Sequence, residues 1–122
     1  MKFVESFELA KLVNSPFAAH RAGESTYFRL WDSIKKYGLV LPLIANESPD
    51  KAGRIIDGHF RAKVAMELGI KTGPVCFVEV ADDKAEQELI LSLNQIKSSW
   101  NYDVLANLYS FSVMERLGFR RP

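Results

Sequence analysis

The chain has few of the residues that hold small proteins together through covalent bonds or metal ions. Its 122 residues include one cysteine, Cys76, and two histidines. A single cysteine excludes an internal disulfide, and no second cysteine offers metal-ligand spacing. Cys76 lies in the apolar run of residues 75–78, so we expect it to be buried as a small hydrophobic residue. A chain of this length can bury a sufficient core without disulfides or metal ions.

Long apolar runs and an excess of one charge are also missing. No stretch approaches the roughly 18 apolar residues that a membrane span requires. Glu5 stands where a signal peptide would carry its apolar segment. We therefore predict a cytoplasmic protein with no membrane partner. The net charge of +1 creates no global field that attracts nucleic acid, so any DNA contact must be local or come from another domain.

Apolar residues make up 48% of the chain and charged residues 25%, which is typical of a globular protein and argues against disorder. Strand-like and helix-like patterns alternate, with glycine, proline or asparagine at their boundaries. The predicted strands are residues 2–7, 39–45, 54–56 and 75–80. The predicted helices are residues 25–37, 60–68, a segment that begins at 83, and 103–117. Without repeats or a second core, this order predicts a single α/β domain.

Two local features refine these boundaries. Pro42 places the strand at residues 39–45 near a sheet edge or a bend, because proline cannot donate a ladder hydrogen bond. Asp83 and Glu86 have the spacing of a capping box, which predicts that this pair opens the helix beginning at residue 83.

The segment of residues 57–63 is the strongest candidate for a functional site. Two apolar β-branched residues run into Asp57 and Gly58, and a helix then begins. The first amides of a helix have no partner within it and lie at the positive end of its dipole, so they form an anion site. Arg61 and Lys63 add two cations to the first turn of that helix. An alternative remains open, in which Arg61 pairs with Asp57 or Glu67 on the surface.

His59 and Phe60 follow the glycine. His59 can act as a general acid or base near neutral pH, or it can simply bond the turn. A metal site is not predicted, because His20 is its sole histidine partner. Phe60 is expected to belong to the core.

Several motifs resemble those of a known family, in the same order along the chain. Residues 57–69 resemble the GERRxRA box of ParB N-terminal domains and its Asp-Gly-His-x-Arg relatives. Residues 33–43 look like the family's helix–strand unit. Residues 14–16 with Arg21 stand where the family has Asn-Pro…Arg, and residues 73–75 are similar to its Ile-Pro-Val. This resemblance to the ParB/sulfiredoxin superfamily implies a small mixed sheet flanked by helices.

The resemblance also implies a nucleotide site, since ParB proteins bind CTP with magnesium. The residues that it places on the nucleotide or its phosphates are Arg21, Gly58, His59, Arg61, Lys63 and Asn94. His59 and Phe60 replace the Glu-Arg of the box, and Leu93 replaces the Glu beside Asn94. The predicted cofactor is therefore a nucleotide, either CTP or ATP/ADP, with or without Mg²⁺.

Three functions remain open. The preferred one is a nucleotide-binding module linked to DNA partition or phage DNA modification. The second is an enzyme, either a small-molecule phosphotransferase similar to free serine kinases or a ParB-type nuclease, with Asp57 and His59 as candidate catalytic residues. The third is a degenerate fold kept for dimerisation through Trp100 and the last helix. Sulfiredoxin chemistry is not expected, because Cys76 lies on the strand after the turn that carries the catalytic cysteine in sulfiredoxins.

The predicted core spans residues 1–100, and residues 101–122 form a C-terminal helix. Residues 94–119 resemble ParB-like domains of phage and plasmid proteins, which are often fused to or encoded beside DNA methyltransferases. We expect the chain to be cut from a longer protein. Its predicted partners are a nucleotide, DNA through a fused or separate domain, and a second copy in a homodimer.

Overall fold

The computed structural model describes residues 1–17 and 24–98, which form a five-stranded mixed sheet with three helices. The strands are β1 (Lys2–Glu8), β2 (Val13–Asn14), β3 (Leu43–Asn46), β4 (Arg54–Asp57) and β5 (Thr72–Val78). The helices are α1 (Glu24–Tyr37), α2 (His59–Glu67) and α3 (Asp83–Ser98), with short 3-10 helices η1 (Leu9–Lys11) and η2 (Pro49–Lys51). The predicted α/β class and the small mixed sheet are confirmed.

The strands follow the order β1-β5-β3-β4-β2 across the sheet. β5 pairs with β1 antiparallel and with β3 parallel, whereas β4 pairs with β3 antiparallel and with β2 parallel. The last residue of β4 therefore lies at the opposite end of the strands from the last residues of β3 and β5. β2 and β4 end on the same side of the sheet, because they run parallel.

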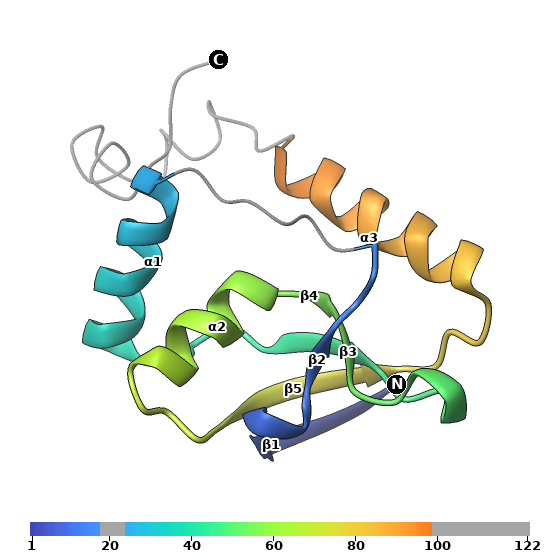
Figure 1. Cartoon of the computed structure of the whole chain (residues 1–122), viewed down its shortest axis with the longest axis horizontal. Helices are drawn as coiled ribbons and strands as arrows, with labels where there is room; N and C mark the ends of the chain where they lie inside the picture. Colours follow the sequence, from blue (N-terminus) through green and yellow to red (C-terminus); the bar gives the residue numbers. More distant parts are fainter. Residues whose placement is uncertain (18–23, 99–122) are drawn as a thin grey trace.

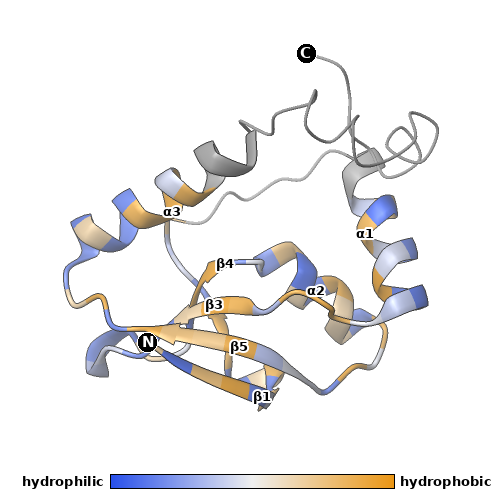
Figure 2. Ribbon diagram, turned by 180° about the vertical axis from the view of Figure 1, so that it is seen from behind, coloured by the Kyte–Doolittle hydropathy of each residue, from blue (hydrophilic) through white to orange (hydrophobic). Residues whose placement is uncertain are grey.

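The core lies between this sheet and two of the helices. Alternate positions of the central strands face it, as the period of two in a strand requires. Figure 2 shows these strands as the apolar centre of the molecule, with hydrophilic turns on the outer sides of the helices. The buried cluster comprises Leu9, Leu12, Ile34, Leu43, Ala45, Ile55, Ala62, Val64, Ala65, Val75 and Phe77.

Helices α1 and α2 pack side by side, and α3 packs against β4 (Figure 1). A polar contact joins the first two helices. The Tyr27 hydroxyl donates to the Glu67 carboxylate, and Trp31 Nε1 donates to the same oxygen over 3.2 Å. The hydrogen bond from Tyr27, followed by that from Trp31, holds the pKa of Glu67 below its usual value.

The prediction of a strand at residues 39–45 is wrong in its first half. Extended pairing begins at Leu43, and residues 39–42 form a loop. Pro42 cannot donate to a ladder. The carbonyls of Leu41 and Pro42 instead accept hydrogen bonds from the Arg61 guanidinium, at 2.9 and 3.4 Å.

The capping-box prediction is also wrong, although a helix does begin at Asp83. Asp82 is the residue that caps the helix, because its carboxylate accepts from the amide of Lys84 over 3.0 Å. The Glu86 side chain is fully buried and points into the protein, away from the helix start. β5 ends at Val78, earlier than predicted, and Val80 exchanges two hydrogen bonds with the Asn46 side chain instead.

Two burial predictions need adjustment. Cys76 is half-buried, because the core-facing positions of β5 are 73, 75 and 77. Phe60 is also half-buried, against the ring of His59, and does not belong to the core cluster. The helix predicted at residues 103–117 and the role of Trp100 lie outside the described residues. Within those residues, no helix is long and apolar enough to cross a membrane.

Candidate functional site

The candidate site is the turn between β4 and α2. β4 ends at Asp57, Gly58 occupies the N-cap position, and α2 begins at His59. The amide of Ala62 donates to the Gly58 carbonyl over 2.9 Å, which closes the first helical turn. Gly58 has no side chain with which to cap the amides that follow it, and the first turn contains no acidic residue. This end of α2 therefore keeps the positive electrostatic character of a helix N-terminus.

Gly58 adopts a left-handed conformation, with φ 98° and ψ 21°. A Cβ atom at this position would lie 2.5 Å from Leu43 Cδ2 and 2.8 Å from Arg61 Nη2. The backbone angle thus favours glycine, and any larger residue would also have to displace the ends of the Leu43 and Arg61 side chains. The turn is shaped by the packing of Arg61 and Leu43 around a residue with no side chain.

Arg61 points inward, and its side chain is 16% exposed. Besides the two loop carbonyls, its guanidinium faces Asp57, with 3.5 Å between Nη2 and Oδ2. Burial lowers the pKa of Arg61, and the charge of Asp57 partly offsets that effect. The pairing of Arg61 with Asp57 was one of the two predicted alternatives, but the pair is largely buried rather than on the surface. Pairing with Glu67 is not observed, since that carboxylate binds Tyr27 and Trp31.

The other predicted residues lie at different distances from the turn. His59 is half-buried beside Phe60, with 4.2 Å between the ring centroids. Lys63 is exposed and leans toward α1, with its Nζ 5.7 Å from the centroid of the Tyr27 ring. Asn94 belongs to α3, but its side chain is outside the described part, as is the whole of Arg21. The structure therefore brings together Asp57, Gly58, His59 and Arg61.

A magnesium site has little support in the described residues. They contain no group of three or more His, Cys, Asp or Glu side chains that could hold a metal ion. Asp57, the carboxylate at the turn, is paired with Arg61. Leu93, where the family has a carboxylate, cannot ligate a hard cation. The described residues therefore do not by themselves form a protein-held Mg²⁺ site.

The role of the loop carbonyls at Leu41 and Pro42 was missed at the level of sequence. Every residue has a backbone carbonyl, so no residue type marks the two that meet Arg61. The side chains of Val40 and Leu41 are exposed and give this loop an apolar surface. From the sequence alone, an exposed apolar loop cannot be distinguished from a buried strand.

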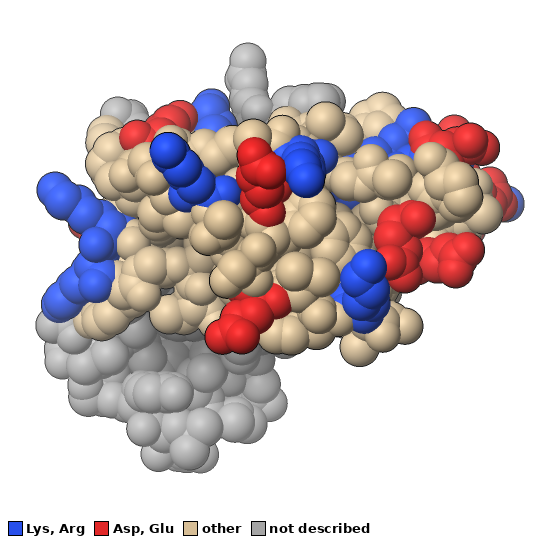
Figure 3. Space-filling model, turned by 90° about the horizontal axis from the view of Figure 1, so that it is seen from below, with Lys and Arg blue, Asp and Glu red and all other residues tan. Residues whose placement is uncertain are grey.

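Charges on the surface are mixed. Figure 3 shows one face of the molecule, on which basic and acidic side chains are interspersed among uncharged residues. This face has no continuous basic stripe of the kind that tracks a phosphate backbone.

Comparisons with known proteins agree with the fold. The family model of the ParB N-terminal domain matches residues 3–94. A putative replication protein B from Sinorhizobium fredii is 30% identical, and the match covers 98% of this chain and 38% of that protein. The chromosome-partitioning protein ParB of Caulobacter vibrioides is 33% identical over 70% of this chain and 28% of its own length. The chain thus spans about a quarter to two fifths of the curated relatives that it matches.

Solved structures of ParB and of a sulfiredoxin share the fold of this chain. Truncated ParB from Caulobacter crescentus, complexed with CTP-gamma-S, superposes with a TM-score of 0.71 at 27% identity, covering 93% of this chain and 63% of that one. The same protein complexed to the centromeric parS site gives a TM-score of 0.53 at 28% identity, over 80% and 50% of the chains. Sulfiredoxin from Arabidopsis thaliana shares the fold, with a TM-score of 0.56 at 20% identity over 73% and 98% of the chains.

Proposed function

Because the chain belongs to the ParB N-terminal domain family, we propose that it is a nucleotide-binding module that serves DNA partition or replication. CTP is the nucleotide, and its phosphates lie against the first turn of α2. The ParB structure that holds CTP-gamma-S supports this choice, since it shares the fold over most of this chain.

The observation that carries the proposal is the start of α2. A left-handed glycine brings the backbone into the helix without a capping side chain, and no carboxylate occupies the first turn. Amides at a helix N-terminus bind phosphate well because they are oriented donors at the positive end of a dipole. A hydrogen bond to a charged group contributes about 1.5–3 kcal/mol. Two or three such bonds therefore give useful affinity without a metal ion.

Arg61 and Lys63 take different roles in this proposal. The Arg61 guanidinium holds the loop of residues 39–42 and Asp57, and so fixes the shape of the turn. Lys63 is exposed, one turn into the helix, and supplies a positive charge to the phosphates when its Nζ leaves the Tyr27 ring. His59, at the first helical position, contributes its amide. The predicted contributions of Arg21 and Asn94 remain part of the proposal.

The test is isothermal titration of the chain with CTP, ATP, ADP and inorganic phosphate. We expect CTP to bind more tightly than the other three. Lys63→Gln should weaken CTP binding by about two- to fivefold, because one partly screened charge contact worth about 0.5–1 kcal/mol is lost. Lys71→Gln removes an exposed lysine just before the strand that follows α2 and should leave the affinity unchanged.

Equal affinity for all four ligands, or equal effects of the two lysine substitutions, would contradict a specific site at this turn. Turnover of ATP with a small hydroxyl substrate would instead favour the phosphotransferase. That enzyme has less support, since Asp57 as a general base would first have to leave Arg61.

DNA contact is proposed to come mainly from other parts of a longer protein. The ParB relative whose structure holds parS DNA has about twice the length that this chain covers. The net charge of +1 and the mixed charges on the face in Figure 3 agree with a DNA contact made mainly elsewhere. Roles in phage DNA modification, homodimer formation and a cytoplasmic location stay predictions.

A further inference from the structure

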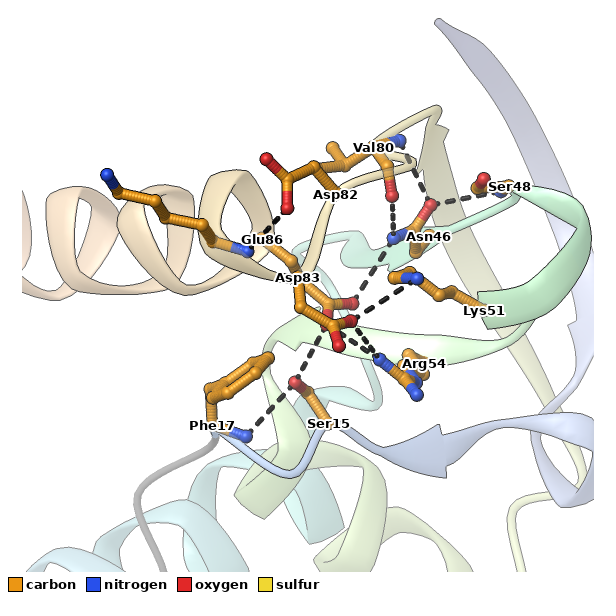
Figure 4. A network of polar contacts seen from close by, with 11 residues as sticks. Ser15, Phe17, Asn46, Ser48, Lys51, Arg54, Val80, Asp82, Asp83 and Glu86 are labelled. Atoms are coloured by element: carbon orange, nitrogen blue, oxygen red, sulfur yellow. Dashed lines mark hydrogen bonds and ion pairs between the residues drawn. The ribbon is translucent and has the colours of Figure 1, made fainter.

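Glu86 is a fully buried carboxylate with partners from three other segments of the chain (Figure 4). Its Oε2 accepts from the Ser15 hydroxyl at 3.3 Å and from Arg54 Nη1 at 3.1 Å. Its Oε1 accepts from Asn46 Nδ2 at 3.2 Å. These four residues, Ser15, Asn46, Arg54 and Glu86, are called the Glu86 network below.

The network is well satisfied for a buried charge. An ionised carboxylate in the interior is costly unless it is paired and hydrogen-bonded. Arg54 supplies the opposite charge and also contacts Asp83 at 3.1 Å, which in turn pairs with Lys51 at 3.2 Å. Burial lowers the pKa of Arg54, but the hydrogen bonds to Glu86 and Asp83 outweigh that effect and raise it overall. The first turn of α3 is thus fixed to the start of β4 by two acidic residues.

Asn46 and Ser15 extend the network to two further segments. The Asn46 side chain also bonds the backbone of Ser48 and Val80, so it organises the ends of β3 and β5. The Ser15 hydroxyl accepts from the amide of Phe17 at 3.2 Å, which shapes the chain as it leaves β2. Removing Glu86 would release α3 and this segment together.

The strand β4 links the network to the candidate site. Arg54 begins β4, and Asp57 ends it next to Gly58. β2 runs parallel to β4 and pairs with its first two residues, and Ser15 directly follows this paired segment. The first turn of α3 is held at Arg54, and α3 packs against β4. The Glu86 network therefore fixes the start of the strand that ends at the nucleotide turn.

We propose that Glu86 is a positioning residue for nucleotide binding. It does not touch the nucleotide. By tying the first turn of α3 and Ser15 to the start of β4, it holds in place the strand that ends at the turn of Gly58, and nucleotide affinity depends on it. This inference rests on the proposed function of that turn.

The experiment compares Glu86→Ala, Glu86→Gln and Ser15→Ala with a control, Glu88→Ala, which removes an exposed carboxylate from the same helix. CTP affinity is measured by isothermal titration at a temperature where urea unfolding curves show each variant to be folded. Hydrogen exchange followed by mass spectrometry reports on residues 83–98 and, separately, on β3 and β5.

Glu86→Ala should weaken CTP binding by about three- to thirtyfold, the range seen for residues that act through others. Exchange in α3 should rise while β3 and β5 stay protected. Glu86→Gln keeps the shape, and its amide oxygen can still accept from Ser15 and Arg54. Its NH2 group would face the Asn46 Nδ2 donor, however, and the ion pair with Arg54 is lost, so this variant should recover part of the affinity. The CTP affinity of Ser15→Ala should lie between that of Glu86→Ala and that of Glu86→Gln. Glu88→Ala should bind CTP as tightly as the unmodified protein.

If Glu86 only stabilised the fold, Glu86→Ala would lower the free energy of unfolding and leave the CTP affinity of the folded protein unchanged. That result for Glu86→Ala, or unchanged exchange in α3, would overturn the proposal. If Glu86→Ala does not fold, Ser15→Ala and Glu86→Gln decide it by the same two measurements. If the unmodified chain binds no CTP, the proposed function fails, and the exchange data still show whether Glu86 anchors α3.

Discussion

At the scale of single residues, Gly58 and Arg61 determine the shape of the candidate site. The sequence placed Gly58 between a strand and a helix, and the structure has it there with a left-handed φ of 98°. The inward orientation of Arg61 was left open. Its partners are an acid four residues earlier and two backbone carbonyls from a distant loop, and the second kind of contact has no sequence signature.

Gly58→Ala tests the packing at the turn. A Cβ atom would meet Leu43 and Arg61 at distances shorter than van der Waals contact, in addition to the cost of a left-handed alanine. We expect a loss of about 2–4 kcal/mol in the free energy of unfolding, measured by urea denaturation. Gly69→Ala is the matched control, because Gly69 has φ +82° and a Cβ atom added there would meet nothing within 4 Å. It should lose about 1 kcal/mol. Equal losses at both positions would refute a role for the close packing.

At the scale of elements, local patterns and tertiary contacts compete. The apolar spacing of α2 and the glycines that flank it predicted that helix to within one residue. Residues 39–42 have a strand-like composition, yet the Arg61 contact and Pro42 keep them in a loop. Glu86 has the spacing of a local cap, but three distant partners bury it. Local reasoning fails where a side chain has better partners far away in sequence.

The contact between α1 and α2 predicts a pH effect. The pKa of Glu67 is lowered in the folded state, first by the Tyr27 hydroxyl and then by Trp31. Its stabilisation is therefore full above the unfolded-state pKa of about 4.3 and is lost as the pH falls through the lower folded-state value. The range from about pH 5 to about pH 3 spans the unfolded-state pKa of a glutamate. When the pH is lowered through this range, the free energy of unfolding should fall more for the unmodified protein than for Glu67→Gln.

Urea denaturation monitored by Trp fluorescence measures this difference. Tyr27→Phe removes the main cause of the shift and should give a pH dependence between those of the unmodified protein and Glu67→Gln. Glu88→Gln, an exposed carboxylate on α3, serves as control for the loss of an acidic residue. Parallel pH profiles for the unmodified protein and Glu67→Gln would show that the helix contact contributes nothing.

At the scale of the whole molecule, the candidate site and the Glu86 network lie at opposite ends of β4. The turn to α2 follows the last residue of this strand, and the Glu86 network, which holds α3, gathers at its first residue. The fold and the position of the turn could be predicted because several weak motifs occur in the family's order. The network could not be predicted, since Ser15, Asn46, Arg54 and Glu86 form no motif along the chain and meet only through the strand order.

The most direct measurement of the central claim is a titration of ¹⁵N-labelled protein with CTP, followed by two-dimensional NMR. If CTP binds at this turn, the shifts should be saturable, largest for the amides of Gly58, His59 and Phe60, and smaller along β1 and β5. Saturable binding whose largest shifts lie away from residues 57–63, or the absence of any shift there at saturating CTP, would contradict it.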